Sequence, residues 1–326
     1  MTRAIAAGGS MIETHDLRRT FKTRSGTVEA VRGVDLDIAA GEIFGFLGPN
    51  GAGKTTTLRM LATLLKPTGG QATVAGADLA RDPDTVRRRI GYVPQGGSTD
   101  PAETGRGELV IQGRLYGMNK PTAHARAREV LAALDLEAAA DRPVGTYSGG
   151  MRRRLDVGLG IVSRPQVLFL DEPTTGLDPQ ARARMWDEIR GLREGGTTVF
   201  LTTHYLEEAD ALADRLAIID HGVIVAEGTG DELKRQVAGD VVTIGIDGDP
   251  EAVLAVVRDQ PFVREATIED DRIRLYVDQG DTALPQLIRV LDGVGLRARS
   301  LSLARPSLDD VFLRQTGRSL REEPAA

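Results

Sequence analysis

The chain of 326 residues is 41% hydrophobic and 27% charged, a composition that excludes wholesale disorder and allows one larger and one smaller globular domain. It contains no cysteine, which excludes disulfides and thiolate metal sites, and its net charge of −6 argues against a large nucleic-acid surface. No stretch of the sequence approaches the roughly 18 to 20 apolar residues of a membrane span, so we expect a soluble, cytoplasmic protein whose membrane role, where it has one, requires a partner.

The N-terminal part predicts strands that lead into a glycine-rich loop and a helix. Residues 1–10 carry no periodic apolar pattern, and we expect a flexible leader there, with either Met1 or Met11 as the true start. Between Met11 and Ile38, alternating apolar and polar residues predict strands of an antiparallel edge sheet. The apolar run "EIFGFL" (42–47) is typical of a strand buried on both faces, and a helical period begins within "GPNGAGKTTTLRML".

The middle of the chain alternates strands with helices. After a β segment in "QATVAG", a helical insertion covers about 96–163. Strands are expected at 167–170, 197–203 and 215–220, with helices at about 180–193 and 205–213. This alternation predicts an α/β fold with a mainly parallel sheet core, to which an antiparallel β edge subdomain and the helical insertion are added.

The last quarter of the sequence follows a different pattern. From residue 239 the order is strand, helix, strand, strand, helix, strand, which is the order of a small ferredoxin-like α+β unit. The closing stretch "SLDDVFLRQTG" predicts one amphipathic helix, so the C-terminal domain is expected to span 239–317. The main domain is then 11–238, and residues 318–326 are expected to form a flexible tail.

The sequence "GPNGAGKT" (48–55) fits the phosphate-binding pattern GxxxxGK[ST] and lies between a predicted strand and a predicted helix. Backbone N–H groups of such a loop surround the β-phosphate, Lys54 reaches the β and γ oxygens, and Thr55 offers a hydroxyl to Mg²⁺. The alternative is a glycine-rich turn with a surface lysine. The nucleotide-binding residues predicted here are Gly48, Pro49, Asn50, Gly51, Ala52, Gly53, Lys54, Thr55 and Thr56.

Two acids and two further polar residues follow predicted strands. "VLFLDEP" ends a buried strand with Asp171 and Glu172, which point different ways if both continue the strand. We therefore expect Asp171 near the Mg²⁺ shell and Glu172 near the attacking water as general base. His204 follows "TTVFLTT" and Gln95 follows "GYVP", so that His204 can bond the γ-phosphate and Gln95 can contact Mg²⁺ and the water. The predicted catalytic residues are Glu172, His204 and Gln95, and the predicted metal ligands are Thr55, Gln95 and Asp171.

A second anion site is predicted at "YSGGMRRR" (147–154). Ser148, Gly149 and Gly150 precede a helix whose positive end suits a terminal phosphate, and this helix is expected to bury Leu155, Leu159 and Val162. If the helical insertion holds this helix away from the chain's own nucleotide, the phosphate belongs to a second copy. The arginines at 152–154 fit a solvated helix face, a contact with phosphate or the opposing copy, or a contact with nucleic acid.

Over about 11–237 the chain resembles the ATP-binding subunit of an ATP-binding cassette (ABC) transporter. The resemblance lies in six motifs that occur in this order: "GPNGAGKT", "GYVPQ", "YSGGM", "VLFLDEP", "TGLDP" and "TTH". Three further segments are similar to the daunorubicin/doxorubicin-resistance type of exporter ATPase: "TGRGELVIQGRLYGM", "TYSGGMRRRLD" and "PSLDDVFLRQTGRSL". The resemblance implies that Phe21 stacks on adenine, which otherwise would be a core or edge-strand aromatic. It also implies a Walker A loop at 48–55, a Q-loop at Gln95, a signature at 148–151, a Walker B pair at Asp171 and Glu172, a D-loop at Asp178 and a switch histidine at His204.

The chain departs from the family pattern at three residues. Phe21 replaces the usual tyrosine, Tyr147 the usual leucine of the signature, and Met151 the usual glutamine. Phenylalanine keeps the aromatic face for adenine, whereas methionine removes one side-chain amide and leaves the backbone donors of the signature in place.

The resemblance implies an ATPase that binds ATP and Mg²⁺, forms a homodimer around two ATP molecules and powers a separate membrane permease seated on 96–145. It would lie at the cytoplasmic face of the membrane as a peripheral subunit and most simply serve drug export, with no nucleic-acid partner. The alternatives are an ABC-type ATPase acting on nucleic acid or ribosomes, an importer ATPase with a regulatory C-terminal domain, and a nucleotide-gated regulator.

Overall fold

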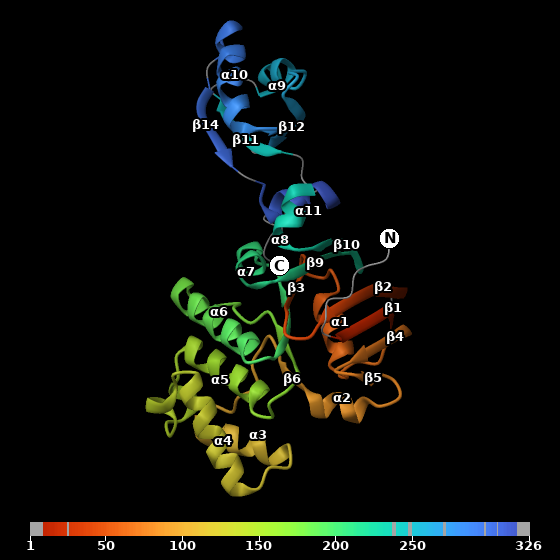
Figure 1. The fold of residues 1–326 in the computed structure, drawn as a ribbon, viewed down its shortest axis with the longest axis vertical. Coiled ribbons are helices and arrows are strands. Elements are labelled where there is room, and N and C mark those ends of the chain that lie inside the picture. Colours follow the sequence, from red (N-terminus) through yellow and green to blue (C-terminus); the bar gives the residue numbers. More distant parts are fainter. Residues whose placement is uncertain are drawn as a thin grey trace. The chain divides into compact units, whose positions relative to one another are not determined.

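The computed structural model describes residues 9–24, 26–236, 239–246, 250–269, 272–296, 298–304 and 306–317. Of the flexible leader expected at 1–10, residues 1–8 lie outside the described residues and Ser10 already belongs to the first strand; the tail expected at 318–326 also lies outside them. The chain divides into two compact units after Gly230 (Figure 1). The domain boundary expected at 238 from the sequence stays a prediction.

An antiparallel sheet opens the first unit. Its four strands run in the order β2-β1-β4-β5, with bounds β1 (Ser10–Thr23), β2 (Gly26–Ala39), β4 (Gly69–Val74) and β5 (Ala77–Asp78). One face is apolar, and the buried Thr14 on it donates its hydroxyl to Val34 O while accepting from Leu36 N, both at 2.8 Å. The antiparallel edge sheet predicted from the sequence is confirmed.

A six-stranded, mainly parallel sheet forms the centre of the first unit. The order is β10-β9-β3-β8-β7-β6, and only β10 runs antiparallel to its neighbour. The strands are β3 (Ile43–Leu47), β6 (Ile90–Val93), β7 (Val167–Asp171), β8 (Thr198–Thr203), β9 (Arg215–Asp220) and β10 (Val223–Gly228). Because the parallel neighbours carry their carboxyl ends at one edge, polar residues that follow β3, β7 and β8 meet there.

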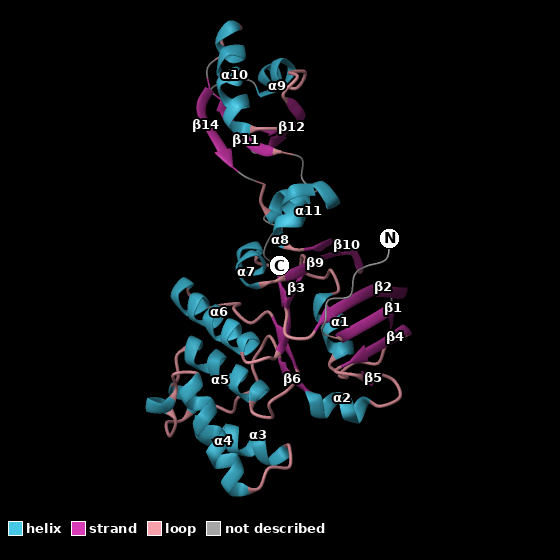
Figure 2. Cartoon of the chain, in the orientation of Figure 1, coloured by secondary structure: helices cyan, strands magenta, loops and turns pink. Residues whose placement is uncertain are grey.

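Side chains alternate between the two faces of this sheet and build two cores. The aromatic side packs Phe44, Phe169 and Phe200 against helix α1 (Lys54–Leu61) and the antiparallel sheet. The other side packs aliphatic residues such as Leu168 and Leu201 against the helices α3 to α6. Figure 2 shows α1 on one side of the central strands and α5 and α6 on the other. Burial on both faces explains why these strands are nearly continuous apolar runs.

The helices of the first unit are α2 (Pro83–Arg89), α3 (Gly105–Leu115), α4 (Lys120–Ala133), α5 (Gly149–Ile161), α6 (Pro179–Glu194) and α7 (Leu206–Leu212), with short 3₁₀ turns at Glu137–Ala139 and Val144–Thr146. Several begin at a capping side chain; Thr104 and Asn119 accept from backbone N–H groups three residues later. The sequence analysis did not predict α2 or β10, because α2 buries a single side chain and β10 is half-exposed throughout.

The second unit has the ferredoxin-like order predicted from the sequence. Its antiparallel sheet runs β12-β13-β11-β14, with helices α9 and α10 packed against it through Val253, Leu287 and Leu291. The bounds are α8 (Gly230–Gln236), β11 (Asp240–Ile246), α9 (Pro250–Val257), β12 (Val263–Glu269), β13 (Arg272–Val277), α10 (Gly280–Gly293), β14 (Ala298–Ala304) and α11 (Leu308–Thr316). Helix α11 begins with a capping box between Ser307 and Asp310. In the part of the chain that the structure describes, no helix combines the length and the apolarity needed to cross a bilayer.

Candidate functional site

The loop 48–55 joins β3 to α1 and presents the first turn of that helix. Gly53 caps the helix with φ of 109°, a conformation in which L side chains are strained. A Cβ on Gly48 would collide with the Ile219 carbonyl, so this position also requires glycine. The backbone N–H groups in the first turn of an α-helix have no helical acceptors, so the start of α1 stays a candidate anion-binding end.

Lys54 begins helix α1 at the end of this loop and is only 4% exposed. Its Nζ donates to the carbonyl oxygens of Gly48, at 2.7 Å, and Pro49, at 3.0 Å. The same atom lies 3.6 Å from Glu172 Oε1. The ammonium therefore holds the loop in a curved shape and stands next to the carboxylate that follows β7.

Asp171 ends β7, and its two carboxylate oxygens have different surroundings. Oδ1 accepts from Thr55 Oγ1 at 2.9 Å and from Thr202 Oγ1 at 2.7 Å. Oδ2 is buried and has no hydrogen-bond partner. A buried carboxylate oxygen without a donor, beside a threonine hydroxyl, is the kind of hard-oxygen set that suits Mg²⁺.

Glu172 is 6% exposed, and several side chains converge on its carboxylate. Oε2 accepts from Gln95 Nε2 at 2.8 Å and from Thr175 Oγ1 at 3.2 Å. His204 Nδ1 lies 3.2 Å from Oε2, although not in hydrogen-bond geometry. Residues that follow three different strands therefore meet at one oxygen atom.

The opposite directions of Asp171 and Glu172 have another origin than the strand alternation assumed from the sequence. The strand β7 ends at Asp171, and Glu172 has a left-handed backbone with φ of 47°. Its N–H is held by the carbonyl and the hydroxyl of Thr202, both at 3.1 Å. A left-handed backbone is uncommon for a residue with a side chain and is found at functional sites.

The charge state of Glu172 follows from its neighbours. Burial raises the pKa of Glu172, but His204, the Lys54 ammonium and the Thr175 hydroxyl together outweigh burial and bring the pKa below the usual carboxyl value. Glu172 is therefore ionised at neutral pH. Only the ionised form can accept a proton from water.

Arg153 corrects the interpretation of the arginine cluster as a solvated helix face. Arg152 is exposed, but Arg153 is 6% exposed and donates to main-chain carbonyls beside Asp171 and Glu172. Arg154 is also turned inward and donates to Leu134 O at 2.7 Å. The run of three arginines gave a wrong prediction because helix α5 is buried on nearly all sides from Leu155 to Ile161, so that little of the helix faces solvent.

The second predicted anion site lies at the start of α5. Ser148 caps this helix by accepting from Met151 N at 3.2 Å, and Ser148 and Gly149 are exposed. Together with Gly150 and Asp178 they line a cavity of about 290 Å³ whose lining contains no residue of the loop 48–55. Asp178 caps α6 through Ala181 N at 2.8 Å. Apart from Phe21, the predicted site residues thus fall into two groups, the first around Lys54 and Glu172 and the second at the start of α5 and α6.

Phe21 lies on β1, half-buried, opposite Val28 of β2. The Arg19 guanidinium covers one face of its ring, 4.5 Å from the ring centroid, and donates to Lys66 O at 2.7 Å. The stacking of Phe21 on adenine stays a prediction, as do the other roles assigned to single residues.

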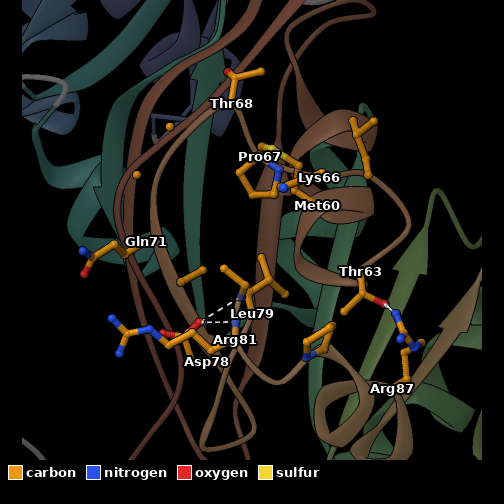
Figure 3. A pocket seen from close by; sticks show the side chains of 16 residues that line it. Met60, Thr63, Lys66, Pro67, Thr68, Gln71, Asp78, Leu79, Arg81 and Arg87 are labelled. Carbon is orange, nitrogen blue, oxygen red and sulfur yellow. Dashed lines mark hydrogen bonds between the residues drawn. The ribbon is translucent and has the colours of Figure 1, made fainter.

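A larger cavity of about 690 Å³ lies apart from these residues, between the end of α1 and the strands β4 and β5 (Figure 3). Lys66, Gln71 and Arg81 are among its lining side chains, and the Asp78 carboxylate at its rim accepts from the backbone N–H groups of residues 80 and 81. Its lining contains none of the predicted site residues, so size alone does not identify the functional site here.

The sequence analysis missed three residues of the first group: Thr202, Thr175 and Arg153. Thr202 lies opposite Asp171 in the register of β7 and β8, and Thr175 accompanies Glu172 in the turn after β7. A polar residue near the carboxyl end of a predicted parallel strand is a signal that could have found Thr202. No comparable signal exists for Arg153, which acts from another helix.

Comparisons with known proteins find similar sequences over nearly the whole chain and a similar fold over its larger part. The family model described as ABC transporter matches residues 31–175, and the model of the C-terminal domain of DrrA1-3-like ATP-binding proteins matches 228–316. The chain is 48% identical to the daunorubicin resistance ATP-binding protein DrrA2 of Streptomyces coeruleorubidus, over 91% of this chain and 93% of that protein. It is also 48% identical to the daunorubicin/doxorubicin resistance ATP-binding protein DrrA of Streptomyces peucetius, over 94% of this chain and 92% of that protein. A solved dimeric post-hydrolysis structure of the ATP-binding cassette MJ0796 bound to ADP and Pi is 26% identical, with a TM-score of 0.62 over 67% of this chain and 98% of that one.

Proposed function

Because this chain belongs to the ATP-binding subunits of ABC transporters, of the daunorubicin/doxorubicin-resistance type, we propose that two copies close around two Mg-ATP and drive a separate membrane permease. The chain is an ATPase of a drug-resistance exporter family. The roles of the single residues, the dimer and the permease partner are proposed here.

The observation that carries the proposed reaction is the set of contacts at Glu172. An ionised, buried carboxylate lies 3.6 Å from the Lys54 ammonium and accepts a hydrogen bond from Gln95. In phosphoryl transfer the protein chiefly positions water and balances charge. Glu172 takes a proton from a water molecule while the water oxygen bonds to the γ-phosphorus, and the bond from γ-phosphorus to the bridging oxygen of ADP breaks. Gln95 and His204 hold Glu172 and the water in line.

The loop 48–55 and the first turn of α1 bind the phosphates through backbone N–H groups and Lys54. Thr55, Asp171 and Gln95 would hold Mg²⁺, and the unpartnered Oδ2 of Asp171 supports this use. The metal, when bound, would supply positive charge that balances the phosphate oxygens. Phe21 would carry the adenine ring on the face that Arg19 does not cover.

The proposed dimer uses the second group of residues. The hydroxyl of Ser148 and the N–H groups of Gly149 and Gly150 would receive the γ-phosphate bound by the partner's loop, with Asp178 beside them. Two facts support this: Ser148 and Gly149 are exposed at a cavity that excludes the chain's own loop 48–55, and a related solved cassette is dimeric.

The proposed permease would rest on the helical insertion at the cytoplasmic face of the membrane, with this chain as a peripheral subunit. Helix α3 carries Ile111 and Leu115, which are 50% and 78% exposed, and apolar surface of this kind favours protein contacts. The names of the relatives support export of a hydrophobic drug. The boundaries 11–238 and 239–317 are proposed for the nucleotide-binding and C-terminal domains.

The absence of cysteine from the sequence allows a direct test of the dimer. One preparation carries Asn50→Cys and a second carries Ser148→Cys, both in a Glu172→Gln background that retains nucleotide. We expect a short bismaleimide to join the two chains only when the preparations are mixed and Mg-ATP is present. Each preparation alone is the control, because a head-to-tail arrangement brings residue 50 next to 148 and not next to another 50.

Two results would contradict the proposed arrangement. One is the absence of cross-linked dimer in the mixture with Mg-ATP. The other is a cross-link formed within a single chain that carries both cysteines, which would mean that the signature caps its own nucleotide.

A further inference from the structure

Arg153 has an unusual environment for a charged side chain. Only 6% of its surface is exposed, and its side chain donates to four main-chain carbonyl oxygens. Nε donates to Pro173 O at 2.7 Å and Nη1 to Pro94 O at 2.7 Å. Nη2 donates to Asp171 O at 3.0 Å and to Glu172 O at 3.2 Å. Every nitrogen of the guanidinium is therefore used.

A buried guanidinium is costly unless opposite charges and acceptors surround it. Burial lowers the pKa of Arg153, while the carboxyl groups of Asp156, Asp171 and Glu208 oppose that effect. The nearest of these in direct contact is Asp156, with Oδ2 at 4.0 Å from Nη1. The short contacts are all to carbonyl groups, so the side chain serves the main chain rather than one ion pair.

The four carbonyl groups belong to the two segments that carry the reacting side chains. Pro94 directly precedes Gln95, Asp171 ends β7, and Glu172 and Pro173 begin the turn that follows it. Gln95 and Glu172 then meet through the hydrogen bond of 2.8 Å between their side chains. A planar guanidinium has its donors in a rigid fork, so it sets the distance between both segments at once.

The turn also needs support for a second reason. Glu172 has a positive φ of 47°, and such a conformation persists only where the surroundings hold it. Arg153 donates to the carbonyl group of Glu172 and to the carbonyl groups of the residues directly before and after Glu172. The carboxylate direction depends on this backbone conformation.

We propose that Arg153 is a positioning residue for ATP hydrolysis, which holds Glu172 and Gln95 in register from the signature helix α5. Its guanidinium donates to main-chain carbonyl groups, and it acts by holding the segments that carry Gln95 and Glu172. The inference rests on the proposed function because it takes Glu172 as the general base.

Other arginines of the chain provide matched controls for the test. Arg153→Lys keeps a positive charge but replaces the fork with a single ammonium group, and Arg153→Gln removes the charge. Arg126→Lys is the half-buried control, because Arg126 donates to the main-chain oxygens of Ile161 and Val162, away from the turn after β7, and Arg88→Lys on α2 is the exposed control. We expect kcat to fall about 10²-fold in Arg153→Lys, as a small misplacement of catalytic groups does. The Kd for a fluorescent ATP analogue is expected to stay unchanged, and both controls are expected to hydrolyse ATP as the unchanged chain does.

A double-mutant cycle separates positioning from general loss of structure. Because Arg153 acts on kcat by holding Glu172 in place, Arg153→Lys is expected to have little further effect on kcat in a Glu172→Gln background, which already lacks the base. A merely structural arginine would lower kcat by the same factor in both backgrounds. The thermal unfolding temperature of each variant is measured beside its kcat. If Arg153→Gln unfolds at a clearly lower temperature than the unchanged chain, the conclusion is drawn from Arg153→Lys alone.

Three results would overturn the inference: a kcat of Arg153→Lys equal to that of Arg126→Lys, a parallel loss of nucleotide affinity, or fully multiplicative effects in the cycle. A different result would overturn the proposed function, namely normal turnover by Glu172→Gln. Normal turnover by Arg153→Lys together with an inactive Glu172→Gln contradicts the positioning role alone.

Discussion

The replacement Glu172→Gln tests the proposed chemistry with the smallest change of shape. It exchanges one carboxylate oxygen for an amide and leaves the side chain in place. The amide oxygen can still accept from Gln95, and Lys54 still donates to the Gly48 and Pro49 carbonyls. The phosphate loop is therefore expected to keep its shape, and nucleotide binding is expected to remain.

What the variant loses is proton acceptance. A positioned general base contributes typically about 10²- to 10⁴-fold to the rate, so kcat is expected to fall by that factor. At about 1.4 kcal/mol for each tenfold change, the barrier rises by about 3 to 5 kcal/mol. Because ATP is bound but not cleaved, the variant is also expected to accumulate as a closed dimer.

Phosphate release at saturating Mg-ATP measures the rate, and light scattering after gel filtration with and without Mg-ATP measures the dimer. Glu207→Gln is the matched control, since Glu207 is an exposed carboxylate on α7. Turnover by Glu172→Gln close to that of the unchanged chain would refute the assignment of Glu172 as base. Loss of ATP affinity together with turnover would refute the argument that Lys54 holds the loop independently of Glu172.

Three further predictions concern binding, packing and pH. Lys54→Ala removes the ammonium that donates to Gly48 O, so nucleotide binding is expected to be lost, and unchanged binding by calorimetry would count against the loop. Phe200→Ala empties the fully buried centre of an aromatic cluster and is expected to lower the free energy of unfolding by about 3 to 5 kcal/mol in urea denaturation; a change near zero would contradict this packing. Burial raises the pKa of Glu208, whose Oε1 accepts from Trp186 Nε1. The stability that Glu208 contributes is therefore complete below the pKa that its carboxyl group has in the unfolded chain. This stability is lost as pH rises through the higher pKa of the carboxyl group in the folded chain. Glu208→Gln does not titrate, so its free energy of unfolding relative to the unchanged chain is expected to rise across that window, and a difference independent of pH would refute the argument.

The order of the elements and the two helix starts that are proposed to bind phosphate could be located from the sequence, because these features depend on neighbouring residues. Alternation of period two marks β1 and β2, and glycines followed by a lysine at a change from strand to helix mark the loop 48–55. The ferredoxin-like order of the C-terminal unit followed from the same local periods. Short or half-exposed elements such as α2 and β10 were missed because they bury too little apolar surface to leave a pattern.

The contacts of the site depend on tertiary structure, since they join residues far apart in the chain. Gln95 and Glu172 are 77 residues apart, and Thr202 reaches Asp171 only through the register of β7 and β8. The direction of Glu172 depends on a left-handed backbone angle held by the neighbouring strand, and strand alternation alone gave the wrong cause.

Arg153 shows the limit most clearly. A run of three arginines after a helix start predicts a solvated surface, because a charge is normally stable only in water. Whether a cation is buried depends on the acceptors that distant segments place around it, and here these are the carbonyl groups beside Gln95 and Glu172. The sequence alone determined which chemical groups the chain carries and in which order, and the packing of sheet and helix α5 decided which of them meet.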